Sequence, residues 1–107
     1  MIFVETPVFT AQIKTLVSDE EYAAFQRELA ADPEAGDVIA GTGGLRKIRM
    51  AAKGKGKRGG ARVIYFYFVA NDRIAMLLAY PKGVKDDLTV REKRILAGII
   101  KTWRHAR

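Results

Sequence analysis

Two apolar runs joined by a short polar turn constrain this sequence more than any other feature. The first run, ARVIYFYFVA at residues 61–70, is rich in β-branched and aromatic residues and is apolar at both odd and even positions. It therefore predicts a strand buried on both faces, in the centre of a sheet. Asn71 and Asp72 follow as a tight turn, and RIAMLLAY at residues 73–80 predicts the next strand of a hairpin.

Helices are predicted on both sides of this hairpin in the sequence. Thr6-Pro7 is typical of a helix start, with the threonine as the cap. SDEE at residues 18–21 is a capping box that begins a second helix, and Pro33 and Gly36 mark its end. TVRE at residues 89–92 is another capping box. The apolar faces at helical spacing are Phe9, Ile13, Leu16 and Val17, then Tyr22, Phe25 and Leu29, and finally Leu96, Ile99, Ile100 and Trp103.

The remaining segments complete an α+β fold. IFVE at residues 2–5 predicts a short strand, and LRKIRMAA at residues 45–52 alternates, so that Leu45, Lys47 and Arg49 share one face. The order becomes β-α-α-β-β-β-α, with an antiparallel sheet core and helices packed on it. We find neither an internal repeat nor a linker, so residues 1–107 are expected to form a single domain.

Positive charge is concentrated in one part of the chain. Residues 1–45 hold eight acids and two bases, a net charge of −6, whereas residues 46–62 hold eight bases and no acid. The whole chain carries a net charge of +7. A concentrated basic patch is typical of a protein with a polyanionic partner. The alternative is a solvated hairpin that only aids solubility, but the bases extend from the loop onto both flanking strands.

Several classes of protein are disfavoured by composition. With no cysteine and one histidine, His105, transition-metal sites and Ser-His or Cys-His nucleophiles are not expected, and neither is a cofactor. The run GKGKRG at residues 54–59 matches G-x-G-x-x-G, but a strand rather than a helix follows it, which disfavours a dinucleotide site. No apolar run is long enough to span a bilayer, and MIFVETPVF lacks the pattern of a signal peptide. A cytoplasmic protein without membrane contact is expected.

The residues that remain for catalysis are lysine, arginine and tyrosine, and this set suits RNA cleavage. RNA carries its own nucleophile, the 2′-hydroxyl beside each phosphodiester. Arginines can hold the phosphate through paired hydrogen bonds, and a lysine crowded by other cations has a lowered pKa and can exchange a proton. Of the aromatic residues behind the basic run, Phe66 and Phe68 are expected in the core, and Tyr65 and Tyr67 either there or on a binding face.

At this point the sequence resembles a known family. GDVIAGTGGLRKIRMAAKGKGKRGGARVIYFYF, LLAYPK and DLTVREKRIL, with VSDEEY at the second helix, are similar to the HigB branch of the RelE superfamily, toxins of bacterial type II toxin–antitoxin systems. The similarity covers almost the entire chain. It implies a RelE-like α+β domain with a basic RNA site on its sheet. It also implies ribosome-dependent cleavage of mRNA, which inhibits translation. The partner would be an antitoxin, expected to be a helix-turn-helix protein encoded by an adjacent gene.

The resemblance also implies site residues. The family's basic pair matches Lys47 and Arg49, and its arginine at the start of the next strand matches Arg62. Its basic residue after the last strand matches Lys82, with Lys85 as the alternative; some relatives place a catalytic tyrosine beyond it, whereas here Tyr80 lies just before it. The predicted catalytic set is Lys47, Arg49, Arg62, Tyr80 and Lys82, and the predicted RNA-binding set is Arg46, Lys53, Lys55, Lys57, Arg58 and Lys85.

Two other functions stay open at this stage. ParE-type members of the superfamily poison DNA gyrase by binding it, without cleaving nucleic acid. A plain RNA-binding module would share the basic patch but cut nothing. The gyrase-binding relatives generally lack the basic catalytic set, so its presence here favours the nuclease; the set is Lys47, Arg49, Arg62 and Lys82.

Overall fold

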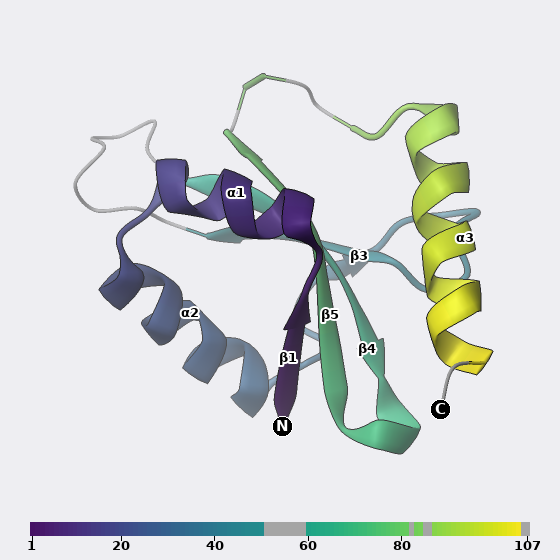
Figure 1. Ribbon diagram of the computed structural model, residues 1–107, viewed down its shortest axis with the longest axis horizontal. Helices are drawn as coiled ribbons and strands as arrows, with labels where there is room; N and C mark the ends of the chain where they lie inside the picture. The colour runs from purple at the N-terminus through teal and green to yellow at the C-terminus, as the bar shows by residue number, and fades with distance from the viewer. Residues whose placement is uncertain (51–59, 82, 85–86, 106–107) are drawn as a thin grey trace.

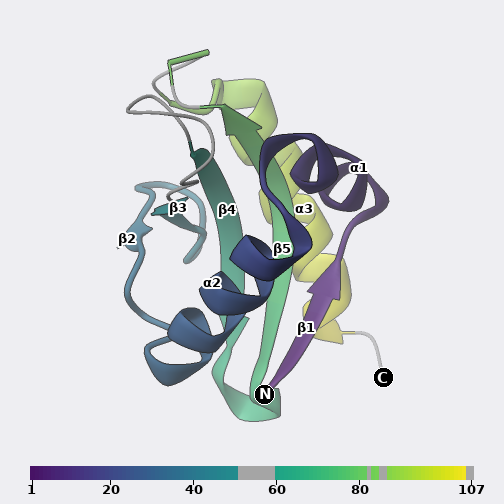
Figure 2. The ribbon, with the colours of Figure 1, turned by 90° about the vertical axis from the view of Figure 1, so that its left-hand side faces the viewer.

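The computed structural model describes residues 1–50, 60–81, 83–84 and 87–105. Within these residues, two helices cover one face of a five-stranded sheet and a third helix covers the other (Figures 1 and 2). In chain order the elements are β1 (Ile2–Glu5), α1 (Pro7–Leu16), α2 (Asp19–Ala31), β2 (Asp37–Val38), β3 (Arg46–Met50), β4 (Ala61–Phe68), β5 (Arg73–Pro81) and α3 (Val90–His105).

The sheet confirms the predicted α+β architecture and adds two features to it. Its strand order is β1-β5-β4-β3-β2, and the pairs from β5 to β2 are antiparallel. β1 extends the sheet beyond β5 as a parallel strand, a pairing that the sequence did not indicate. The two-residue strand β2 was not predicted either. The run at residues 61–70 does lie centrally, but β4 ends at Phe68, and the chain reverses through a 3₁₀ turn at Val69–Asn71.

Each predicted helix start is confirmed in atomic detail. The Thr6 hydroxyl accepts the Phe9 N–H at the start of α1. At α2, Ser18 and Glu21 make the two reciprocal bonds of a capping box. Thr89 and Glu92 make the same pair of bonds before α3. These side chains occupy backbone donors that the first helical turn leaves without an intrahelical partner.

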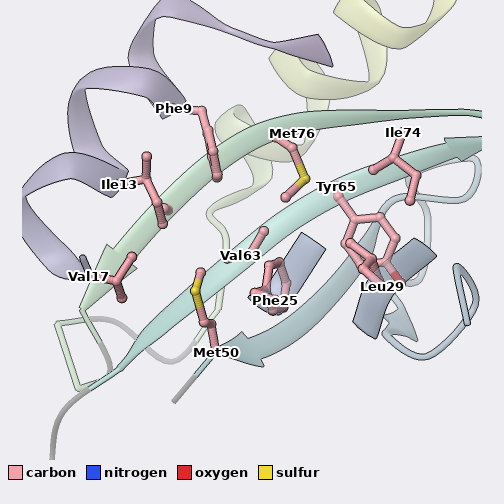
Figure 3. Packing of buried hydrophobic residues seen from close by; sticks show 11 residues of the cluster. Phe9, Ile13, Val17, Phe25, Leu29, Met50, Val63, Tyr65, Ile74 and Met76 are labelled. Carbon is pink, nitrogen blue, oxygen red and sulfur yellow. The ribbon is translucent and has the colours of Figure 1, made fainter. Parts of the chain in front are cut away.

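The first core lies between the sheet and the α1–α2 pair (Figure 3). Tyr65 is fully buried in it, which decides between core and binding face for this residue. Its hydroxyl donates to the Pro33 carbonyl at 2.8 Å and accepts the Gly36 N–H at 2.9 Å, so it fixes the chain that leads from α2 into β2. The buried members are Phe9, Ile13, Val17, Phe25, Leu29, Met50, Val63, Tyr65, Ile74, Met76 and Ala79.

The second core lies between the opposite face of the sheet and α3. Leu96 and Ile100 of α3 are buried there, as the helical spacing predicted, with Ile99 and Trp103 partly buried beside them. From the sheet, Leu45, Ile64, Phe66, Ala75, Leu77 and Tyr80 face this helix. Because side chains alternate along a strand, the two cores divide β4 and β5 between them, and both strands are buried on two faces.

The edge of β5 beyond β1 is closed by α1. β1 pairs with β5 only as far as Met76. Farther along, the Thr6 hydroxyl donates to the Leu77 carbonyl at 2.9 Å, and the Gln12 side-chain oxygen accepts the Ala79 N–H at 2.8 Å. The Leu77 carbonyl and the Ala79 N–H therefore have hydrogen-bond partners beyond the point where β1 ends, close to Tyr80.

Candidate functional site

Three predicted site residues lie in one row across the sheet. Arg49 of β3 is the direct cross-strand partner of Arg62 of β4, and Arg62 is the partner of Tyr80 of β5. Residues directly opposite each other on antiparallel strands project from the same face, with their Cβ atoms about 5 Å apart. The sheet therefore brings together residues that are 31 positions apart in the sequence, between Arg49 and Tyr80.

The opposition of two arginines is unfavourable by itself. Like charges in directly opposed positions destabilise a sheet. Among the described ion pairs, neither Arg49 nor Arg62 has a carboxylate partner. Two guanidinium groups in this arrangement can share one phosphate, since each offers paired donors to its oxygens. The row is thus suited to an anion that bridges the two strands.

Lys47 lies on the same face of β3, two residues before Arg49. Along this face the exposure increases: Leu45 is fully buried under α3, Lys47 is half-buried and Arg49 is exposed. The predicted alternation is confirmed, because Leu45, just before β3, belongs to the α3-side core, whereas Ile48 and Met50 of β3 pack into the core under α1 and α2. The basic face of the strand emerges where the cover of α3 ends.

Tyr80 lies beside Arg62 on the neighbouring strand and is only 6% exposed. Burial raises the pKa of its phenol, and the positive charge of Arg62 opposes that rise without cancelling it. The hydroxyl therefore stays protonated at neutral pH. In that state it can accept a hydrogen bond from Arg62, whose guanidinium has only donors, or donate one to an anion bound at the arginine row, but it is not a base.

The structure adds acidic neighbours that the sequence did not reveal. Asp37 of β2 is the cross-strand partner of Lys47. Arg49 also borders an open cavity of about 520 Å³ between α2 and β3, whose rim carries Glu20, Glu21 and Glu28. These acids precede the basic run in the sequence by at least nine residues, so only the folded chain brings them beside it. The positive field of the site is therefore bounded on its α2 side.

Arg46 is separated from the other predicted RNA-binding residues. It alternates with Lys47 on β3, and its guanidinium donates to the Gly36 carbonyl at 2.7 Å and the Glu34 carbonyl at 3.1 Å. It also pairs with the Glu34 carboxylate at 3.4 Å. These contacts hold the segment between α2 and β2 against the sheet. The structure thus gives Arg46 a structural role, and RNA binding by it stays a prediction.

The other predicted site residues lie outside the described part of the chain. They are the loop residues Lys53, Lys55, Lys57 and Arg58, and the two lysines after β5, Lys82 and Lys85. Their assignment to RNA binding or catalysis stays a prediction from the sequence. Met50 and Ala61, which border the predicted loop in the sequence, are cross-strand partners. They adjoin Arg49 and Arg62, which form the next pair of the same ladder.

Comparison with known families assigns almost the whole chain to one family. The family described as the RelE toxin of the RelE/RelB toxin–antitoxin system matches residues 8–107. The chain belongs to the RelE toxin family. It is therefore assigned to the toxins of toxin–antitoxin systems, for which an antitoxin is the partner.

In the described ranges, no three His, Cys, Asp or Glu side chains are grouped so that they could hold a metal ion. None of the helices in the same ranges combines the length and the apolar composition needed to cross a membrane.

Proposed function

We propose that residues 1–107 form one HigB-type toxin domain, an endoribonuclease that cuts mRNA on the ribosome and so inhibits translation. The observation that carries the proposal is the row of Arg49, Arg62 and Tyr80, with Lys47 on the same face, in a chain of the RelE family. The site of action would be the cytoplasm, where ribosomes and the antitoxin are found.

The proposed reaction uses the RNA itself as the nucleophile. The 2′-oxygen attacks the adjacent phosphorus, the bond from phosphorus to the 5′-oxygen breaks, and a 2′,3′-cyclic phosphate and a 5′-hydroxyl form. One proton leaves the 2′-oxygen and one reaches the 5′-oxygen. Arg49 and Arg62 would hold the non-bridging oxygens, where negative charge increases in the transition state. Lys47 would add positive charge from the same face.

Tyr80 would assist this arrangement from β5, the strand beside Arg62. Because its pKa is raised by burial, its hydroxyl is a donor at neutral pH. With 6% of its surface exposed, it reaches the RNA less readily than Arg62 does. We therefore propose that Tyr80 positions Arg62. The two protons would be transferred by basic residues of the predicted catalytic set, among which Lys82 is the nearest to Tyr80 in the sequence.

In vitro translation followed by primer extension on the message tests the proposal. The purified protein should produce new 5′ ends within codons, and only when ribosomes translate the message. An intact message with normal translation would contradict the proposal and favour a gyrase poison, which a DNA supercoiling assay would then detect. Blocked translation without new 5′ ends would favour an RNA-binding protein that does not cleave.

A further inference from the structure

A second cavity, lined by two basic residues, lies between α3 and the turn that precedes β3. Figure 1 shows this turn beside α3. Its volume is about 420 Å³. The turn contributes residues 41–43, and α3 contributes Ala97, Ile100, Lys101 and Arg104. Ile100 is buried and Ala97 half-buried, so the cavity has an apolar floor and two cationic side chains at its rim.

The charge of this cavity is of one sign. None of its lining residues is acidic, whereas the cavity between α2 and β3 has three glutamates. Among the described ion pairs, neither Lys101 nor Arg104 has a carboxylate partner. The Arg104 guanidinium lies 5.3 Å from the centre of the Phe66 ring, a cation–π contact that restrains this side chain at the cavity. Such a pair of cations without an acid favours an anionic ligand.

The turn exposes backbone to the cavity and is held in place. Gly41 and Gly43 have φ angles of +76° and +75°, and no other atom lies within 4 Å of where a Cβ would be on either residue. Between them, the buried Thr42 hydroxyl donates to the Ile39 carbonyl and accepts the Leu45 N–H. A ligand can therefore approach the main chain of this turn without displacing a side chain.

We propose that this cavity binds a phosphate of the RNA backbone outside the cleavage site. The inference rests on the proposed function for the identity of the ligand. The turn leads directly into β3, where Leu45 packs toward α3 and Lys47 follows on the same face. Leu45 itself is fully buried under α3, so an RNA strand at Lys47 and Arg49 would pass over the exposed turn at Gly41 and Gly43 to reach Lys101 and Arg104, where its ribose or base can contact Ala97.

The test measures binding of a short single-stranded 2′-O-methyl oligonucleotide, which cannot be cleaved, by fluorescence anisotropy at several salt concentrations. The double variant Lys101→Gln/Arg104→Gln should bind more weakly, with a salt slope shallower by about 0.7, the contribution of one phosphate on a single strand. The matched control is Lys14→Gln/Arg27→Gln, which removes the same two charges from exposed positions on α1 and α2, across the sheet. The control should keep the wild-type slope.

A second pair of variants separates charge from volume. Ala97→Glu places a carboxylate in the cavity, and Ala97→Gln places a neutral side chain of similar size there. Circular dichroism should show both folded, and the glutamate should weaken binding more than the glutamine does. Equal binding by these two variants would overturn the inference, as would a double variant that binds like the wild type, a control that loses the same slope, or a wild type that binds no oligonucleotide.

The two proposals can fail separately. If the wild-type protein cuts mRNA on ribosomes but the cavity variants bind the oligonucleotide as it does, the phosphate site is wrong and the nuclease stands. If the wild type cuts nothing but the cavity variants lose affinity and slope as expected, the phosphate site stands and the nuclease is wrong.

Discussion

Arg62 lies between Arg49 on one neighbouring strand and Tyr80 on the other, so its charge does not stabilise the sheet. We expect Arg62→Ala to raise the free energy of unfolding slightly, by about 0.2–1 kcal/mol, because it removes a like-charge pair. The same variant should lose about 10²–10³-fold in the rate of mRNA cleavage, the usual effect of removing one donor to transition-state charge. Chemical denaturation and single-turnover cleavage on ribosomes measure the two effects.

Arg73→Ala is the matched control for this variant. Arg73 is exposed at the opposite end of β5 from Tyr80, and it is paired with Ile2 and Phe68 in the sheet. The Arg73→Ala variant should keep the wild-type rate of mRNA cleavage, and it should arrest growth when it is expressed without antitoxin. A folded Arg62→Ala protein that still arrests growth would remove Arg62 from the site.

Tyr80 allows a second prediction at this scale. If its hydroxyl only positions Arg62, Tyr80→Phe should reduce the cleavage rate by less than Arg62→Ala does, and the rate should keep its dependence on pH below pH 10, the ordinary pKa of tyrosine. A general acid would behave differently, because its removal typically costs 10²–10⁴-fold and deletes one limb of the pH–rate profile. Rates measured over a pH series for both variants decide between the two roles.

At the scale of elements, periodic patterns were sufficient for some features and not for others. The helices and the central strands were predicted because their apolar residues recur at fixed spacing and capping residues mark their starts. β2 could not be predicted, since Asp37 and Val38 are both exposed and too few to show a period. The parallel pairing of β1 depends on where α1 and α2 place the chain, which is tertiary information.

The same reasoning explains what was predictable about the site. Lys47, Arg49 and Arg62 were assigned to the site by the family resemblance, and the β3–β4 hairpin explains why residues on the two sides of one loop lie on neighbouring strands. Asp37 and the glutamates of α2 were missed because their proximity depends on strand order and helix docking. Arg46 was grouped with the RNA-binding residues by sequence adjacency, although alternation along β3 separates it from Lys47.

Gly36 provides a prediction for the element that connects α2 to the sheet. A Cβ on this residue would lie 2.8 Å from the Tyr65 ring and hydroxyl and 3.0 Å from the Lys47 carbonyl, so Gly36→Ala requires movement in a packed core. We expect it to destabilise the fold by about 1–3 kcal/mol. In α3, where an added Cβ at Gly98 meets no other atom within 4 Å, Gly98→Ala should instead stabilise it by about 0.4–1 kcal/mol. Thermal or chemical denaturation measures the stability of the two variants. A change of stability in the same direction for both would contradict this packing.

At the scale of the molecule, charge is divided between the two sides of the sheet. The acidic first part of the chain, with a net charge of −6 over residues 1–45, supplies the helices α1 and α2 that cover one face. Lys47, Arg62 and the α3 cavity belong to the other side, and Arg49 lies at the boundary, where it also borders the cavity lined by the α2 glutamates. A polyanion is thus attracted to one side and repelled from the other, which orients it before contact. The same division affects the antitoxin, the partner that the family implies.

An antitoxin that silences an open basic surface has to cover or distort it. We expect it to present acidic and apolar residues to the surface of Lys47, Arg49 and Arg62, since the acidic α2 side repels such a segment. Association of the purified pair should then be fast at low salt and slower at high salt, and Lys47→Gln/Arg49→Gln should lower the association rate at low salt. Lys14→Gln/Arg27→Gln, on the far helices, should change it little. If the association rate changes neither with salt nor in the Lys47→Gln/Arg49→Gln variant, the antitoxin docks elsewhere, for example along the outer edge of β1. It would then inhibit by an indirect effect on the site.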